Sequence, residues 1–185
     1  MDEQPTLHVI AGPNGAGKST LAKLYLPKLG GIPFLNADVI AEKLSPGNPD
    51  AVLLEAGRQL LTRVDQLIDQ RESFCLETTL SGKAYHRLIR RVRGLGYHVV
   101  MQFVWVATPE QSLRRVRQRV TEGGHDVPED AVRRRHPATL KNFWMLYLPL
   151  VHDWQFYDNS SGEMTLVAEG LSDVPDEDRF QSCLP

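Results

Sequence analysis

Nine residues near the start of the chain have the types and the spacing that phosphate chemistry needs. They are Gly12, Pro13, Asn14, Gly15, Ala16, Gly17, Lys18, Ser19 and Thr20, and they fit the G-x-x-x-x-G-K-[ST] pattern of a phosphate-binding loop (P-loop). Backbone N–H groups at the start of a helix hold phosphate oxygens, and glycines let the chain approach them closely. We predict that this loop binds ATP, that Lys18 reaches the β- and γ-phosphates, and that Ser19 ligates Mg²⁺.

Two polar segments follow short apolar runs further along the chain. Asn36-Ala37-Asp38 comes after residues 32–35, and Glu77-Thr78-Thr79 comes after residues 73–76. Ligands of open α/β sheets bind beyond the carboxyl ends of the strands, so we expect both segments to lie near the P-loop.

Asp38 is the candidate general base for a substrate hydroxyl. The alternative is that Asp38 only caps a helix starting at Val39, as aspartates often do. Glu77 is predicted to hold Mg²⁺ through a water or to receive a substrate hydroxyl, and its alternative is a solvated strand end. Thr79 is a weaker candidate, because β-branched residues suit strand ends in any case.

Arginines are dense in the second half of the chain. They stabilise the charge that spreads over the γ-phosphoryl oxygens during transfer. The Gly123-Gly124 break between two arginine-rich helical segments is typical of a hinged lid. The alternative is an ordinary salt-bridged surface, since Arg133 and Arg134 follow Glu129 and Asp130 by four residues. The candidate phosphate contacts are Arg115, Arg117, Arg119, Arg133, Arg134 and Arg135.

Apolar runs of strand length alternate with longer helical patterns, which predicts a parallel sheet with crossover helices. The expected strands lie at residues 7–10, 32–35, 73–76, 97–107, 155–158 and 164–168. The expected helices lie at about 21–27, 50–71, 83–93 and 109–121, with another from Pro128 that Pro137 interrupts before an aromatic-rich stretch at 140–154. We predict a three-layer α/β P-loop kinase fold, with a mainly parallel sheet of five to six strands and a helical arginine-rich lid at about 109–152.

The composition is that of an ordinary globular protein. Its 185 residues suit a single domain spanning 1–185, and a formal net charge of −2 argues against general nucleic-acid binding. The two cysteines form no disulfide framework, and Cys75 is expected to be a core thiol. Residues 1–5 lack the features of a signal peptide, and no apolar stretch is long enough to span a bilayer, so a cytoplasmic protein without membrane contacts is expected. Residues after Gly170 are expected to form a loosely packed end.

Two classes of P-loop protein lack their signatures here. There is no N-K-x-D sequence, which reads guanine in regulatory GTPases, and no apolar strand ends in Asp-Glu, as in motor and transporter ATPases. A P-loop, an acid after the second strand and an arginine lid favour a small kinase. The alternatives are a kinase for another metabolite or a nucleic-acid end, and a nucleotide-gated binding module without catalysis.

Taken in order, these motifs resemble the zeta-toxin family of P-loop kinases, in its short stand-alone branch. The matching pieces are residues 12–20, 36–38, 77–79, 119–129, 133–135 and 157–160. The resemblance implies ATP and Mg²⁺, a UDP-sugar such as UDP-N-acetylglucosamine as phosphoryl acceptor and, for some members, a small antitoxin partner. Carried over residue by residue, it makes Asp38 the catalytic base, Lys18 the P-loop lysine, Glu77 and Thr79 substrate ligands, and Arg119 and Arg134 the lid arginines.

Overall fold

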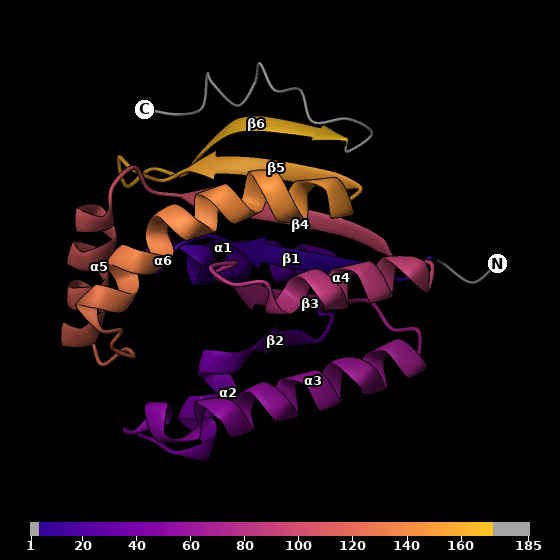
Figure 1. Cartoon of the computed structure of the whole chain (residues 1–185), viewed down its shortest axis with the longest axis horizontal. Helices are drawn as coiled ribbons and strands as arrows, with labels where there is room; N and C mark the ends of the chain where they lie inside the picture. Colours follow the sequence, from indigo (N-terminus) through magenta and orange to yellow (C-terminus); the bar gives the residue numbers. More distant parts are fainter. Residues whose placement is uncertain (1–3, 172–185) are drawn as a thin grey trace.

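The centre of the protein is a six-stranded sheet in the order β2-β3-β1-β4-β5-β6 (Figure 1). The computed structural model describes residues 4–171, apart from the side chain of Asp50. The first five strands run parallel, and β6 pairs antiparallel with β5. The strands are β1 (Thr6–Ala11), β2 (Phe34–Asn36), β3 (Phe74–Thr78), β4 (His98–Trp105), β5 (Asp153–Asp158) and β6 (Thr165–Leu171). The predicted mainly parallel α/β sheet is therefore confirmed.

Helices cover both faces of the sheet and make the fold three-layered. Residues of α3, α4 and η3 join one large cluster with one face of the strands, and residues of α1 join a smaller cluster on the other face. The helices are α1 (Lys18–Tyr25), α2 (Ala37–Leu44), α3 (Leu53–Asp69), α4 (Ala84–Gly94), α5 (Pro109–Thr121) and α6 (Glu129–Asn142). Single turns are η1 (Leu26–Leu29), η2 (Pro49–Val52), η3 (Phe143–Tyr147) and η4 (Leu148–Leu150).

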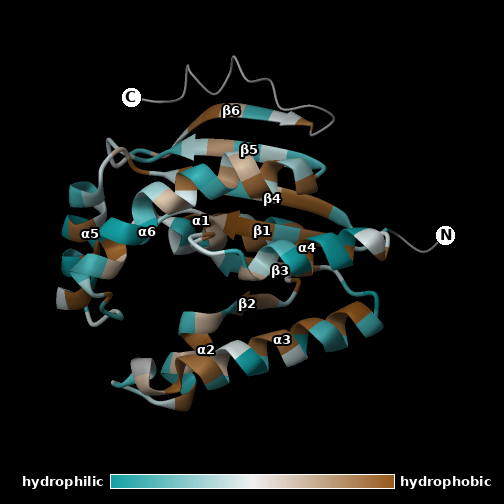
Figure 2. Ribbon diagram, viewed as in Figure 1, coloured by the Kyte–Doolittle hydropathy of each residue, from teal (hydrophilic) through white to brown (hydrophobic). Residues whose placement is uncertain are grey.

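The strands flanked by helices are apolar along most of their length, as strands buried on both faces must be. In Figure 2, β1 and β4 are mostly brown, whereas α4 shows teal residues on its outer side. Leu7 and Val9 of β1 point into the large cluster, while Ile10 points into the cluster under α1. This alternation holds β1 in the middle of the sheet, so its carboxyl end, where the P-loop starts, has a fixed place.

One local alternative is excluded and one local prediction is wrong. A helix capped by Asp38 would start at Val39, but α2 starts at Ala37, because the Asn36 side chain caps it. Pro137 does not interrupt the chain, because it lies inside α6. Its ring removes one helical hydrogen bond, a change that costs about 3 kcal/mol in a helix interior. Burial of His136 and Thr139 on either side of it, and of Ala131 and Val132 one turn earlier, keeps the helix continuous.

Some expectations fall on residues that the structure does not describe. These are the start of the chain at residues 1–3 and the acidic end at residues 172–185, which includes Cys183. Between residues 4 and 171, no helix combines the length and the apolar character needed to cross a membrane. Cys75 is buried on β3, as predicted, and burial raises the pKa of its thiol to about 12.

Candidate nucleotide and acceptor site

A pocket of about 250 Å³ lies at the carboxyl ends of β1, β2 and β3. The parallel register pairs Glu77 of β3 with Ile10 of β1 and with Asn36 of β2, which brings the three polar segments to one edge of the sheet. The residues lining the pocket are Asn14, Lys18, Asn36, Ala37, Asp38, Leu53, Glu77, Thr78, Thr79, Ser81, Tyr85, His125, Asp126, Val127, Pro128 and Arg135.

Close contacts on several sides shape the P-loop. Gly12 has a φ of +143°, and a Cβ there would overlap the backbone carbonyl oxygen of Val104 on β4. Gly17 has a φ of +103°, and a Cβ there would lie 2.6 Å from the Asn159 amide nitrogen. That amide also donates to the Ala16 carbonyl at 2.7 Å. The loop is therefore held between β4 and the turn after β5, which gives Asn159 of the 157–160 motif a structural role.

Lys18 lies under the loop with its charge turned toward the pocket residues. Its side chain is buried, and Nζ donates to the Pro13 carbonyl at 3.0 Å. Burial lowers the pKa of Lys18, while the carboxylates of Glu77 and Asp38 act in the opposite direction. A bound phosphate would favour the charged lysine in the same way as these carboxylates.

Ser19 and Glu77 form the part of the site that suits a divalent cation. The Ser19 hydroxyl donates to the two carboxylate oxygens of Glu77 at 3.1 and 3.3 Å. Glu77 is only 8% exposed, which excludes a solvated strand end. Hydroxyl and carboxylate oxygens are the ligands that Mg²⁺ prefers, so these two residues fit the ion beside the phosphates.

Asp38 does not cap a helix. The Asn36 Oδ1 atom takes that role and accepts from the backbone N–H groups of Asp38 at 2.8 Å and Val39 at 3.4 Å. The Asp38 carboxylate sits in the first turn of α2 on the pocket side. Within residues 4–171 it has no hydrogen bond or ion pair, so it is available to a substrate.

The opposite side of the pocket comes from the segment after β3. The Thr79 and Ser81 hydroxyls are 3.0 Å apart and hydrogen-bonded, and both line the pocket together with Tyr85 of α4. Glu77, Thr79 and Asp38 thus border one space, as the motifs predict.

The arginines of residues 109–142 that are candidate phosphate contacts differ in their surroundings. Arg119 Nη2 donates to the His125 carbonyl at 2.5 Å, and its Nε atom is buried without a partner among the described residues. Its charge helps to lower the pKa of Lys18, as a nearby positive charge does. On α6, Arg135 lines the pocket, whereas Arg134 is exposed and does not.

The motifs do not single out Arg135, although helix periodicity could have found it. The buried face of α6 consists of Ala131, Val132, His136 and Thr139. At about 100° per residue, Arg135 falls within this face and Arg134 falls well outside it. The structure therefore brings Lys18, Asp38, Glu77, Thr79 and Arg135 together on the pocket, with Arg119 close by.

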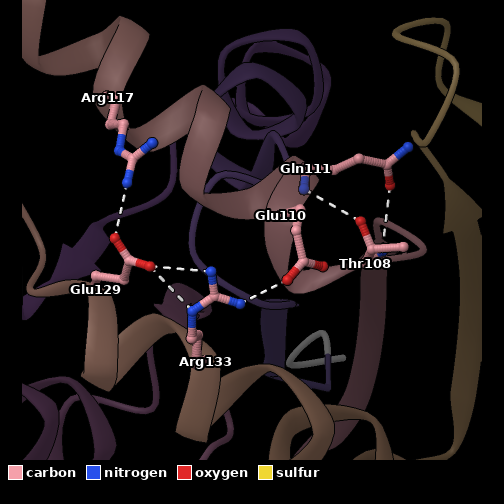
Figure 3. A network of polar contacts seen from close by, with 6 residues as sticks. All are labelled: Thr108, Glu110, Gln111, Arg117, Glu129 and Arg133. Carbon is pink, nitrogen blue, oxygen red and sulfur yellow. Dashed lines mark hydrogen bonds and ion pairs between the residues drawn. The ribbon is translucent and has the colours of Figure 1, made fainter.

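Other arginines of this region make ordinary surface ion pairs (Figure 3). Arg133 bridges Glu110 of α5 at 2.5 Å and Glu129 of α6 at 2.9 Å, and Arg117 contacts Glu129 at 2.7 Å. Hydrogen bonds from Arg133 lower the pKa values of Glu110 and Glu129. The predicted pair between Arg134 and Asp130 is not among the ion pairs of residues 4–171. For Arg133 and Arg117, the salt-bridge alternative therefore holds.

We call residues 109–142 the α5–α6 hairpin. It has a small core of its own, made of Leu113, Val116, Val127, Ala131 and Val132. Its loop supplies His125, Asp126, Val127 and Pro128 to the pocket. The hairpin therefore closes one side of the site with a unit that has a small core of its own, while His136 and Leu140 of α6 contact the main core.

Comparison of the sequence with known proteins gives one matching family and one relative. Residues 7–143 match the family AAA_33, described as an AAA domain. An uncharacterized protein of Haemophilus influenzae is 31% identical over 125 residues, which are 68% of this chain and 88% of that protein.

Solved structures share the fold at lower identity. A structure of the PezAT toxin–antitoxin system of Streptococcus pneumoniae has a TM-score of 0.75 and 17% identity, and the match covers 100% of this chain and 79% of that chain. The AvrRxo1-ORF1:-ORF2 complex with ATP has a TM-score of 0.76 and 21% identity, and the match covers 98% of this chain but only 64% of that longer chain. A putative kinase from Chloroflexus aurantiacus has a TM-score of 0.59 and 18% identity, covering 74% of this chain and 79% of that chain.

With a P-loop at the carboxyl edge of a mainly parallel sheet, and a family match over most of its length, the chain belongs to the AAA_33 family of AAA domains.

Proposed function

We propose that this protein is a kinase that transfers the γ-phosphoryl group of ATP to a hydroxyl of a small molecule. The observation that carries the proposal is the convergence of Lys18, Glu77 and Asp38 on one pocket at the ends of β1, β3 and β2. A phosphate ligand, a cation ligand and an uncommitted carboxylate are the groups that this transfer needs.

Each group has a distinct part in the reaction. The P-loop and Lys18 hold the β- and γ-phosphates, and Arg119 and Arg135 neutralise charge on the transferring group. Mg²⁺, held through Ser19 and Glu77, would supply positive charge at the phosphate oxygens. The acceptor oxygen bonds to the γ-phosphorus as the bond to the ADP oxygen breaks. Asp38 receives the proton that leaves the acceptor hydroxyl.

The proposed acceptor is a UDP-sugar such as UDP-N-acetylglucosamine. The ordered motifs support it, and Thr79, Ser81 and Tyr85 supply hydroxyl groups suited to a sugar. The structural likeness to a toxin–antitoxin protein also supports a small antitoxin as a protein partner. Both statements go further than a shared fold and need their own tests.

The decisive experiment offers the protein ATP, Mg²⁺ and a panel of acceptors. The panel contains UDP-N-acetylglucosamine, other UDP-sugars, free monosaccharides and an oligonucleotide with a 5′-hydroxyl end. We expect one sugar class to gain a phosphoryl group, detected by mass, and Lys18→Ala to abolish the product while the protein still unfolds cooperatively. ATP consumption that no acceptor stimulates would point instead to a nucleotide-gated module.

A further inference from the structure

One buried side-chain oxygen of the pocket has no partner among the residues that the structure describes. Asn14, in the middle of the P-loop, is only 6% exposed and lines the pocket. Its Oδ1 atom is buried and accepts no hydrogen bond from the residues that the structure describes. Burying a carbonyl oxygen without a donor is unfavourable, so the group needs a donor from elsewhere.

Several other polar side chains that line the pocket are already paired. Asn36, the same residue type on the same pocket, caps α2 with its Oδ1 atom. Lys18 donates to the Pro13 carbonyl, and Glu77 accepts from Ser19. Thr79 pairs with Ser81. Asn14 therefore differs from Asn36 in having a side-chain oxygen that the fold does not use.

The chemistry of the reactants limits which of them can pair with this oxygen. The ATP phosphates are acceptors at neutral pH, so they cannot donate to a carbonyl oxygen. The P-loop binds phosphates through backbone N–H groups, which need no side chain at position 14. The acceptor molecule does carry O–H groups. One of these reacts and loses its proton to Asp38, so a different one is left for Asn14.

We propose that Asn14 is a specificity residue whose Oδ1 atom accepts a hydrogen bond from a second hydroxyl or amide N–H of the phosphoryl acceptor. The proposal rests on the kinase function proposed above and deepens it. It defines the acceptor class as a molecule with a donor group next to the hydroxyl that reacts, as in a vicinal diol or a hydroxy-amide of a sugar ring. Simple alcohols lack that second donor and are poor acceptors.

The first test needs no acceptor. Thermal unfolding of the ligand-free Asn14→Ala protein is compared with that of Asn36→Ala, a matched control. Removing the unpaired carbonyl leaves the melting temperature of Asn14→Ala unchanged or higher, whereas Asn36→Ala lowers it through loss of the α2 cap. A clearly lower melting temperature for Asn14→Ala, or failure to fold, would make Asn14 a structural residue and overturn the proposal.

The second test uses the acceptor that the wild-type protein phosphorylates in the panel, together with its single-deoxy and deamidated analogues. Loss of one non-reacting donor lowers the wild-type kcat/KM on the order of tenfold or more. Asn14→Ala loses this discrimination at the same position, and its KM for ATP stays within about twofold, since the backbone N–H groups remain. Unchanged discrimination at every position, or a raised KM for ATP alone, would overturn the proposal. If no compound of the panel is phosphorylated, the proposed kinase function is wrong. The melting comparison then still shows whether Asn14 stabilises the fold.

Discussion

At the scale of single residues, Asn36 and Asp38 divide two roles between them. The amide of Asn36 holds the start of α2, so the carboxylate of Asp38 is not needed for the fold. Of these two side chains, only the carboxylate can accept a proton from a hydroxyl, whereas an amide can cap a helix as well as a carboxylate can. The order Asn-x-Asp thus places the proposed base in the first turn of a helix whose start Asn36 already holds.

We predict that Asp38→Asn lowers product formation at least about a hundredfold, because general-base catalysis contributes roughly 10²–10⁴ in rate. The melting temperature and the nucleotide affinity should stay nearly unchanged. The substitution removes a charge from the first turn of α2, worth about 0.3–1 kcal/mol there. Steady-state turnover and thermal unfolding of the same preparation test this. Wild-type turnover in Asp38→Asn would end the assignment of the base.

Neighbouring arginines on α6 provide a matched comparison. Arg135 lines the pocket and Arg134 faces solvent, yet the two substitutions remove the same side chain. Arginine contacts to a transferring phosphoryl group are worth about 10³–10⁵ in rate. We expect Arg135→Ala to lower kcat on the order of a thousandfold and Arg134→Ala to change it less than about threefold. The reverse order would restore Arg134 as the lid arginine.

At the scale of elements, the loop of the α5–α6 hairpin holds Arg119 in place. The Gly124 N–H donates to the Arg119 carbonyl at 2.9 Å, and the Arg119 side chain passes over Gly124. A Cβ on residue 124 would lie 2.5 Å from Arg119 Cγ. The glycine is therefore needed because the arginine stem occupies the space that a side chain would take.

Gly124→Ala should therefore act on turnover through Arg119. We expect kcat to fall by at least about tenfold, because the guanidinium is displaced from the transferring group. Gly123→Ala is the control, since residue 123 has a φ of +85° and no atom lies within 4 Å of the position that its Cβ would take. Its cost is backbone strain of about 1–2 kcal/mol in stability, with turnover retained. Equal effects of both changes on turnover would contradict this role.

Some elements and site residues could be predicted from sequence patterns, and others could not. The strands and the P-loop follow from apolar runs and glycine spacing, which are local signals, and all are found near their predicted places. The cap at Asn36 is also a local signal, because its side chain accepts from the N–H groups two and three residues on and Asn is a preferred cap residue. The continuous helix through Pro137 depends instead on tertiary packing, which overrides local preference. Arg135 depends on which face of α6 is buried, and that face is set by its contacts with α5 and with the end of β4. The absence of a partner for the Asn14 Oδ1 atom could not be predicted from the sequence, because it depends on the positions of all the surrounding groups.

At the scale of the whole molecule, a buried histidine makes stability depend on pH. His8 of β1 lies under α1, where its Nδ1 atom is 3.1 Å from the Tyr25 hydroxyl. Burial, with a smaller effect of His98, lowers its pKa from 6.5 to about 4. Between these two pH values the unfolded chain binds a proton that the folded protein does not. His8 therefore lowers stability as the pH falls from 6.5 to 4, by an amount on the order of 3 kcal/mol.

The prediction is tested with His8→Gln, which cannot take up this proton. Urea unfolding at pH 7 and at pH 4.5 gives the free energy of unfolding of both proteins. We expect the difference between them to shift in favour of His8→Gln by about 2 kcal/mol at the lower pH. Comparing the two proteins cancels the titration of the other histidines. Equal losses in both would show that His8 is protonated as easily in the folded state as in the unfolded chain.

The separate core of the α5–α6 hairpin has a consequence for how the protein opens. Its five apolar residues pack on one another, and Arg133 joins the two helices outside that core. We expect such a unit to unfold as one cooperative piece, at a lower free energy than the sheet beneath it. In native-state hydrogen exchange, the amides of α5 and α6 should therefore exchange together and earlier than those of β1 and β4. Bound nucleotide should slow that shared exchange through Arg119 and Arg135. Independent exchange of the two helices would show that they respond to ligands separately.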